Sequence, residues 1–101
     1  MSMLVSRLME EATKSYEKIL EISKEIENNL QVLGLDFSFK FIIEQRCIIF
    51  EFSRQGMTIY GKSYAYSSYK SLRKEIIIDE LMNGLIRELH HWEVIINTLQ
   101  Q

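Results

Sequence analysis

The fold of this chain is decided by residues 36–56, which read DFSFKFIIEQRCIIFEFSRQG. Apolar and polar side chains alternate through most of this stretch, and the side chains of a strand point alternately to two faces of a sheet. The alternation predicts two half-buried strands over residues 36–44 and 47–53, separated by a short polar turn. Gly56 follows the second strand and can adopt the positive φ that a tight hairpin connection needs, so a third strand is expected to follow it.

That third strand is predicted over residues 57–66, and long helices are predicted on both sides of the strands. Residues 3–33 and 70–99 carry apolar residues at helical spacing, and Gly34 stands where the first helix should stop. The 101-residue chain therefore predicts a single α+β domain, built from a long helix, a three-stranded antiparallel meander and a second long helix.

The first helix carries a heptad pattern that has two interpretations. At 1.5 Å per residue, a helix of this length is about 45 Å long, which exceeds the width of a domain of this size. The apolar seam either packs on the sheet or joins two copies of the chain, and we favour a homodimer. The seam residues assigned to that dimer interface are Val5, Leu8, Ala12, Ile19, Ile22 and Ile26.

Composition points to a folded protein of a reducing compartment. Charged residues make up 26% of the chain and the net charge is −2, so the chain as a whole lacks the excess of cations that is typical of nucleic-acid binding. Cys47 is the single cysteine, which excludes an internal disulfide and favours the cytoplasm. No signal peptide is recognisable, and no apolar stretch approaches the ~20 residues that would span a bilayer, so no membrane association is expected.

The residues that could support catalysis or bind a metal do not form a recognisable motif. Cys47 has no histidine near it in the sequence, although a nucleophilic thiol needs a neighbouring base. His90 and Glu93 share a helix face, but a closed metal site takes three or four ligands. We therefore expect no enzymatic activity, no metal and no cofactor.

Residues 57–74 stand out because they contain cations and tyrosines but no acidic residue. Tyrosines can cover the sheet, contact a partner protein, or stack on bases while the cations meet phosphates. Sheet packing, a protein interface and a nucleic-acid interface therefore all remain open for this segment. The residues predicted to form a binding surface, here called the basic tyrosine segment, are Tyr60, Lys62, Tyr64, Tyr66, Tyr69, Lys70, Arg73 and Lys74.

Residues 34–95 resemble small uncharacterised proteins encoded by staphylococcal phages. The resemblance rests on Gly34-Leu35-Asp36-Phe37 opening a strand, the apolar strand Ile48–Phe52, a turn with Met57, Tyr64-Ala65-Tyr66, and a long helix containing Trp92. It implies an accessory protein that acts in the host cytoplasm in host takeover or counter-defence. A fainter similarity to the acidic dimeric chaperones of secretion systems implies binding of extended client proteins.

These observations together predict a non-enzymatic protein-interaction module. Its most specific form is a dimeric inhibitor of a host or defence complex that contacts an acidic partner through the basic tyrosine segment. Nucleic-acid binding by the same segment is the main alternative, and a small acidic dimeric chaperone is a further one.

Overall fold

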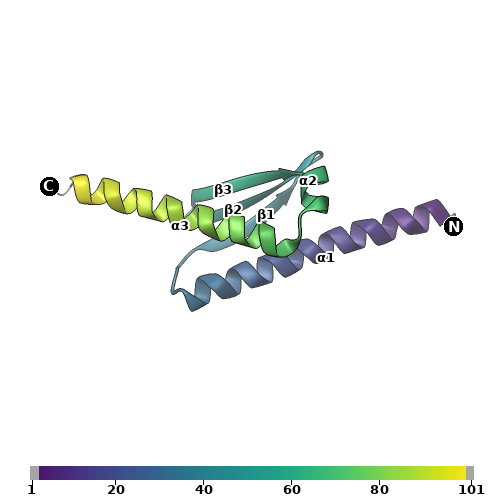
Figure 1. Cartoon of the computed structure of the whole chain (residues 1–101), viewed down its shortest axis with the longest axis horizontal. Helices are drawn as coiled ribbons and strands as arrows, with labels where there is room; N and C mark the ends of the chain where they lie inside the picture. Colours follow the sequence, from purple (N-terminus) through teal and green to yellow (C-terminus); the bar gives the residue numbers. More distant parts are fainter. Residues whose placement is uncertain (1–2, 100–101) are drawn as a thin grey trace.

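The computed structural model describes residues 3–99 as three strands and three helices. In chain order they are α1 (Met3–Val32), β1 (Ser38–Ile43), β2 (Cys47–Arg54), β3 (Met57–Ala65), α2 (Tyr66–Ser71) and α3 (Lys74–Leu99). The strands form one antiparallel sheet in the order β1-β2-β3, and α1 and α3 lie against the same face of it (Figure 1). The predicted α+β fold, with long helices before and after a three-stranded meander, is confirmed.

Three boundaries differ from those expected from the sequence. The helix expected over residues 70–99 is two helices, because the backbone is extended at Leu72, with ψ 138°. Tyr66, expected at the end of the third strand, begins α2 instead. The first strand begins at Ser38, which pairs with Ser53 near the end of β2. β2 ends at Arg54, where the hairpin to β3 begins, so almost no residue of β2 remains to pair with the residues before Ser38.

Gly34 ends α1 with a pair of backbone hydrogen bonds. The amide of Gly34 donates to the carbonyl of Gln31 at 3.1 Å, and the amide of Leu35 donates to the carbonyl of Leu30 at 2.9 Å. These two bonds form a Schellman motif, which requires a left-handed residue, and Gly34 has φ +68°. The glycine therefore reverses the chain direction and leads the chain from α1 toward β1.

The hairpin between β2 and β3 has a tight turn followed by a β-bulge. Gln55 and Gly56 both have positive φ, 53° and 77°, as a two-residue type I′ turn requires. Phe52 pairs with Tyr60 while the next residue of β2 pairs with Thr58, so Ile59 is the extra residue of a bulge. Because of this bulge, Ile59 and its sequence neighbour Tyr60 are both half-buried and both pack against the core, whereas neighbours in a regular strand point to opposite faces.

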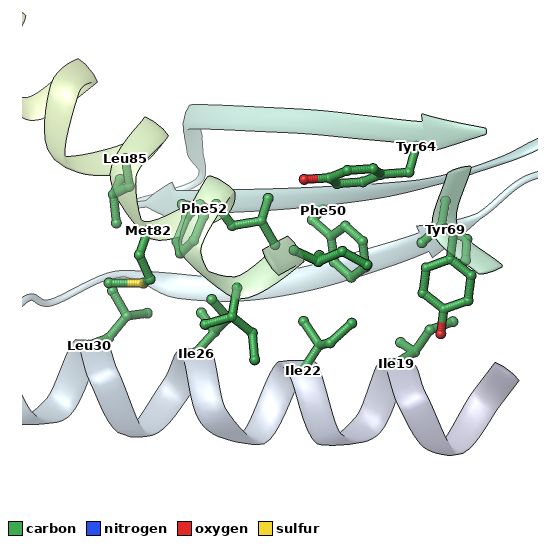
Figure 2. Packing of buried hydrophobic residues seen from close by; sticks show 14 residues of the cluster. Ile19, Ile22, Ile26, Leu30, Phe50, Phe52, Tyr64, Tyr69, Met82 and Leu85 are labelled. Carbon is green, nitrogen blue, oxygen red and sulfur yellow. The ribbon is translucent and has the colours of Figure 1, made fainter. Parts of the chain in front are cut away.

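The core lies between the sheet and the two long helices (Figure 2). Successive inward residues of β2 are fully buried, and α1 and α3 each contribute an apolar stripe at three- and four-residue spacing. β2 is the central strand, which explains why its inward side chains are covered on both sides. The buried residues are Ile19, Ile22, Ile26, Leu30, Ile48, Phe50, Phe52, Tyr64, Tyr69, Ile77, Ile78, Leu81, Met82 and Leu85.

Both long helices extend past the sheet, at opposite ends of the molecule. The molecule measures 67 × 26 × 24 Å, and Figure 1 shows the start of α1 projecting at one end and the end of α3 at the other. Among the described side chains, the first buried residue of α1 is Ile19 and the last buried residue of α3 is Leu85. Sixteen residues of α1 therefore precede its first buried residue and fourteen residues of α3 follow its last, although Leu89 among them still packs against the core.

Candidate functional site

The tyrosines of the basic tyrosine segment fall into different environments. Tyr64 and Tyr69 are part of the core, with exposed fractions of 4% and 1%. Tyr66 is half-buried, and its hydroxyl donates to the carbonyl of Glu44 at 2.9 Å. Tyr60 is also half-buried and lies against the backbone of Gly84 in α3. Much of the aromatic surface that the sequence offers to a partner is thus used in packing within the chain.

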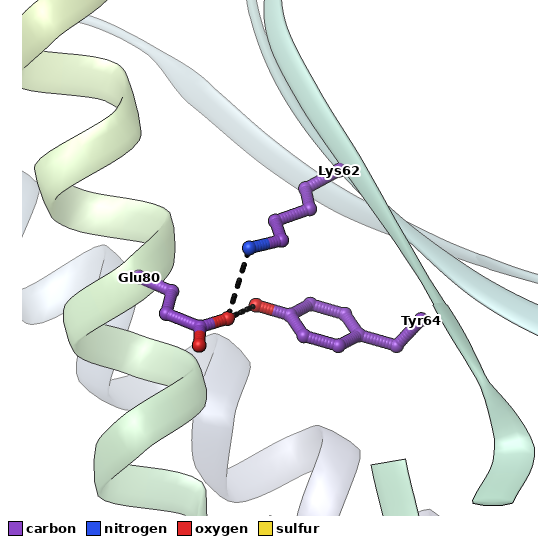
Figure 3. A network of polar contacts seen from close by, with 3 residues as sticks. All are labelled: Lys62, Tyr64 and Glu80. Carbon is purple, nitrogen blue, oxygen red and sulfur yellow. Dashed lines mark hydrogen bonds and ion pairs between the residues drawn. The ribbon is translucent and has the colours of Figure 1, made fainter. Parts of the chain in front are cut away.

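Lys62 and Tyr64 meet Glu80 of α3 at the β3 side of the sheet (Figure 3). The ammonium of Lys62 lies 2.9 Å from Oε2 of Glu80, and the hydroxyl of Tyr64 donates to the same oxygen at 2.5 Å. These hydrogen bonds, first that from Tyr64 and then that from Lys62, lower the pKa of the Glu80 carboxyl. Burial, together with the neighbouring carboxylate, raises the pKa of Tyr64. The cluster fastens β3 to α3.

Lys18 connects α1 to the end of α2. Its ammonium donates to the carbonyl of Leu72 at 2.6 Å and to the carbonyl of Tyr69, and it lies 4.3 Å from the centre of the Tyr69 ring. The hydroxyl of Tyr69 in turn donates to the carbonyl of Ser15 at 2.6 Å. A cation at the carbonyl end of a helix satisfies groups that would otherwise lack donors, so Lys18 caps α2 where the chain leaves it.

The cations at the start of α3 differ in their surroundings. Lys74 lies 3.2 Å from a carboxylate oxygen of Glu21 and 3.2 Å from one of Glu25, both in α1. The hydrogen bonds with Glu25 and Glu21 raise the pKa of Lys74. Lys70 and Arg73 are exposed and form no ion pair within residues 3–99. Of the cations in the segment, these two are the ones left available to a ligand.

The heptad seam of α1 divides between the core and solvent. Ile19, Ile22 and Ile26 are 0–2% exposed and pack on the sheet within one chain. Leu8, by contrast, is 57% exposed, and Ala12 is also exposed. Val5, at 42% exposure, belongs to the same projecting part of the helix. The heptad pattern therefore supplies core residues in the second part of α1 and exposed apolar residues in the first part.

The residues considered for catalysis and metal binding lie in two elements, Cys47 in β2 and the two histidines with Glu93 in α3. Cys47 is half-buried at the start of β2, with its sulfur 4.0 Å from a carboxylate oxygen of Glu44. His90, His91 and Glu93 are exposed on the projecting part of α3. Within residues 3–99, no three histidine, cysteine or acidic side chains come together as a metal site would require.

An apolar groove, here called the Trp92 groove, lies between the projecting part of α3 and the end of the β2–β3 hairpin. Its volume is about 440 Å³. Trp92 is 45% exposed and Ile96 50% on the helix side, and Met57 is 64% exposed on the hairpin side. Arg54 and Glu93 contribute opposite charges from the two walls. The groove is lined by Phe37, Arg54, Met57, Ile59, Leu89, Trp92, Glu93, Ile96 and Asn97.

A second groove lies at the opposite end, beneath the projecting part of α1. Leu8 and Tyr16 of the helix face Ile43 and Tyr66 across it, and Lys70 and Glu11 supply its charges. It contains Leu8 and Ala12 of the exposed half of the heptad seam, and Lys70, one of the two unpaired cations of the basic tyrosine segment. The two grooves have exposed apolar side chains to a similar degree, but the Trp92 groove also contains tryptophan, methionine and arginine, which are enriched at protein interfaces. We take it as the candidate site.

Sequence reasoning did not single out this groove. The steps of four and three from Ile78 to Leu99 predict a helix stripe, but they do not show where the sheet beneath the stripe ends. The sequence did contain one indication that the helix overhangs the sheet, namely its length. α3 has 26 residues, whereas the longest strand has nine. At 1.5 Å per helical residue and about 3.3 Å per strand residue, such a helix must extend past its sheet.

Comparisons with known proteins do not add an assignment. No protein-family model matches the chain, and neither the curated proteins nor the solved structures provide a match. Within residues 3–99, no helix combines the length and the apolar character that crossing a membrane requires.

Proposed function

We propose that this chain is a non-enzymatic protein-interaction module of the cytoplasm and that it binds a partner protein through the Trp92 groove. The observation that carries this proposal is the apolar surface of the α3 end, residues 86–99. Trp92 and Ile96 are about half exposed beside the groove, and Ile86 and Val94 are as exposed on other sides of the helix. Apolar side chains gathered on an exposed helix beside an apolar groove are typical of a protein-interaction site.

The chemistry of the groove favours a protein over a nucleic acid as partner. Its lining is mostly apolar and carries one cation and one anion, whereas a phosphate backbone calls for a row of cations. In the basic tyrosine segment, Lys62 and Lys74 are paired with carboxylates of the same chain. An inhibitor of a host or defence complex, as in the phage resemblance, is the specific form that we propose for such a module.

The test is affinity capture from the source cell, with and without nuclease, using the tagged unsubstituted protein and two tagged variants. Trp92→Ala removes the tryptophan side chain from the groove. Because Trp92 lies outside the buried core, we expect this variant to stay folded. Lys70→Glu with Arg73→Glu removes the unpaired cations of the basic tyrosine segment. We expect the unsubstituted protein and the double variant to retain a stoichiometric, nuclease-resistant partner that Trp92→Ala loses. Circular dichroism confirms that all three are folded.

Two outcomes would contradict the proposal. Retention of the partner by Trp92→Ala, together with its loss from the Lys70→Glu/Arg73→Glu variant, would move the site to the basic tyrosine segment. Captured material that disappears with nuclease, and whose binding falls steeply with salt, would identify a nucleic-acid-binding protein instead.

A further inference from the structure

The α3 end both lines the Trp92 groove and carries exposed apolar side chains of its own. At 1.5 Å per residue, residues 86–99 form a rod about 20 Å long. Leu89 and Ile96 line the groove of their own chain, while Ile86, Val94 and Leu99 have exposed fractions of 48–80%. The segment is therefore both a wall of one apolar groove and an apolar helix of the kind that fills such a groove.

Charge gives a second reason to choose a second copy as the occupant. Arg54 and Glu93 line the groove, and neither forms an ion pair within residues 3–99. A twofold axis makes every contact reciprocal, so an Arg54 that faces Glu93 of the other copy implies that Glu93 of the first copy faces Arg54 of the second. Two opposite charges that lack partners in one chain would then both acquire one.

We propose that the chain forms a twofold-symmetric dimer in which the α3 end of each copy lies in the Trp92 groove of the other, with Arg54 of each paired to Glu93 of the other. This inference rests on the proposed function of the groove as a protein-binding site and takes a second copy of the chain as the protein bound there; a host or defence complex would then be contacted through another surface of the dimer. It also moves the dimer contact predicted from the heptad seam of α1 to the opposite end of the molecule.

The proposed contact between Arg54 and Glu93 can be tested by exchanging the two charges. Arg54→Glu alone leaves two acids in each groove, and Glu93→Arg alone leaves two bases, so each variant should dissociate about tenfold more readily than the unsubstituted dimer. An equimolar mixture of the two variants should form a heterodimer, because both cross-contacts then join an acid to a base. The variant carrying both substitutions should again dimerise with itself. Sedimentation velocity over a dilution series measures all four samples.

The matched control is Arg46→Glu, an exposed arginine in the turn between β1 and β2, which should leave the dissociation constant unchanged. A second readout is built into the groove, because Trp92 is the single tryptophan of the chain. Its fluorescence should shift to shorter wavelength as concentration rises, and the shift should be absent in the two single variants and restored in their mixture.

Several results would overturn this dimer. A monomeric unsubstituted protein with concentration-independent fluorescence would exclude it, and the capture experiment with Trp92→Ala would then still decide the proposed function separately. Single variants that dimerise normally, or a mixture that stays monomeric, would exclude the Arg54–Glu93 contact. Assemblies that keep growing with concentration and that Lys70→Glu disrupts would show head-to-tail contact between the two grooves instead.

Discussion

The backbone of Gly84 in α3 lies directly against the side chain of Tyr60 in β3. A Cβ atom on Gly84 would overlap the hydroxyl oxygen and the ring carbons of Tyr60. Glycine within a helix is destabilising by about 1 kcal/mol relative to alanine when it serves no purpose. Here it has one, because the missing side chain lets the tyrosine ring lie between the sheet and the helix.

Replacing Gly84 with alanine should therefore destabilise the fold although alanine is the better helix former. We expect a loss of about 1–3 kcal/mol in the free energy of unfolding, the usual cost of overpacking. Urea denaturation measures it, and Asn83→Ala, at the neighbouring exposed position of α3, serves as the control. In a Tyr60→Ala background the same glycine substitution should cost nothing, and an unchanged cost there would refute the explanation.

The two halves of the α1 seam should respond differently to the same truncation. Ile22→Ala removes methyl groups from a fully buried site facing the sheet, so it should lower the free energy of unfolding by about 2–5 kcal/mol. Leu8→Ala acts on an exposed side chain and should change it by at most about 0.5 kcal/mol. Equal effects in thermal or urea unfolding would mean that the projecting half of α1 is buried in solution.

Lys18→Met should remove the cap of α2 while preserving most of the apolar stem of the side chain. We expect a loss of about 1 kcal/mol in the free energy of unfolding, because carbonyls of Tyr69 and Leu72 lose their charged donor. NMR shifts should change most at Leu72 and its neighbours. Lys14→Met, one turn earlier and exposed, is the control, and a loss of equal size there would argue against capping.

Stability should fall in alkaline solution because of buried tyrosine. Burial, with a smaller contribution from Glu21, raises the pKa of Tyr69 from 10.0 to about 12. A raised pKa in the folded state means that the stabilisation is complete below pH 10 and is lost as the pH rises from 10 toward 12. Urea midpoints measured across that window should decline, and Tyr69→Phe should weaken the decline. A flat profile would contradict the burial of this hydroxyl.

Ser23→Ala should stabilise the protein. The hydroxyl oxygen of Ser23 is buried and has no hydrogen-bond partner among the described residues, and a buried polar group without a partner is costly. We expect a gain of about 1 kcal/mol, part of which comes from the higher helix propensity of alanine. Asn28→Ala, exposed on the same helix, measures the propensity effect alone. If the two gains are equal, the hydroxyl is satisfied in solution.

Strands and long helices were predictable from the sequence because their signals are local. The alternation around Phe39 and Phe50 is contained in each strand, and Gly34 and Gly56 mark turns by their own conformational freedom. The environments of Tyr64 and Tyr66 were not predictable in this way. The two tyrosines are nearly adjacent and chemically identical, and they are distinguished only by the end of β3 between them and by the position of α3.

The candidate groove depends on residues that meet only after folding. Met57 and Ile59 come from the hairpin, and the bulge at Ile59 places that side chain toward the helix, whereas Trp92 comes from α3. Each of these residues has an ordinary explanation in its local sequence. These residues meet only because β3 begins at Met57 and α3 continues to Leu99. The two boundaries lie far apart in the sequence, so no short stretch of it predicts the groove.

The contact between Lys18 and Leu72 has a consequence for how the chain divides into parts. The side chain that donates to the Leu72 carbonyl at the corner between α2 and α3 stands 54 positions earlier, in a different helix. A fragment that starts after α1 would lack this donor, and we expect residues 66–99 to continue through Leu72 as one uninterrupted helix. We therefore expect the direction in which Trp92 is presented to depend on α1, so that a fragment without α1 should not reproduce the Trp92 groove.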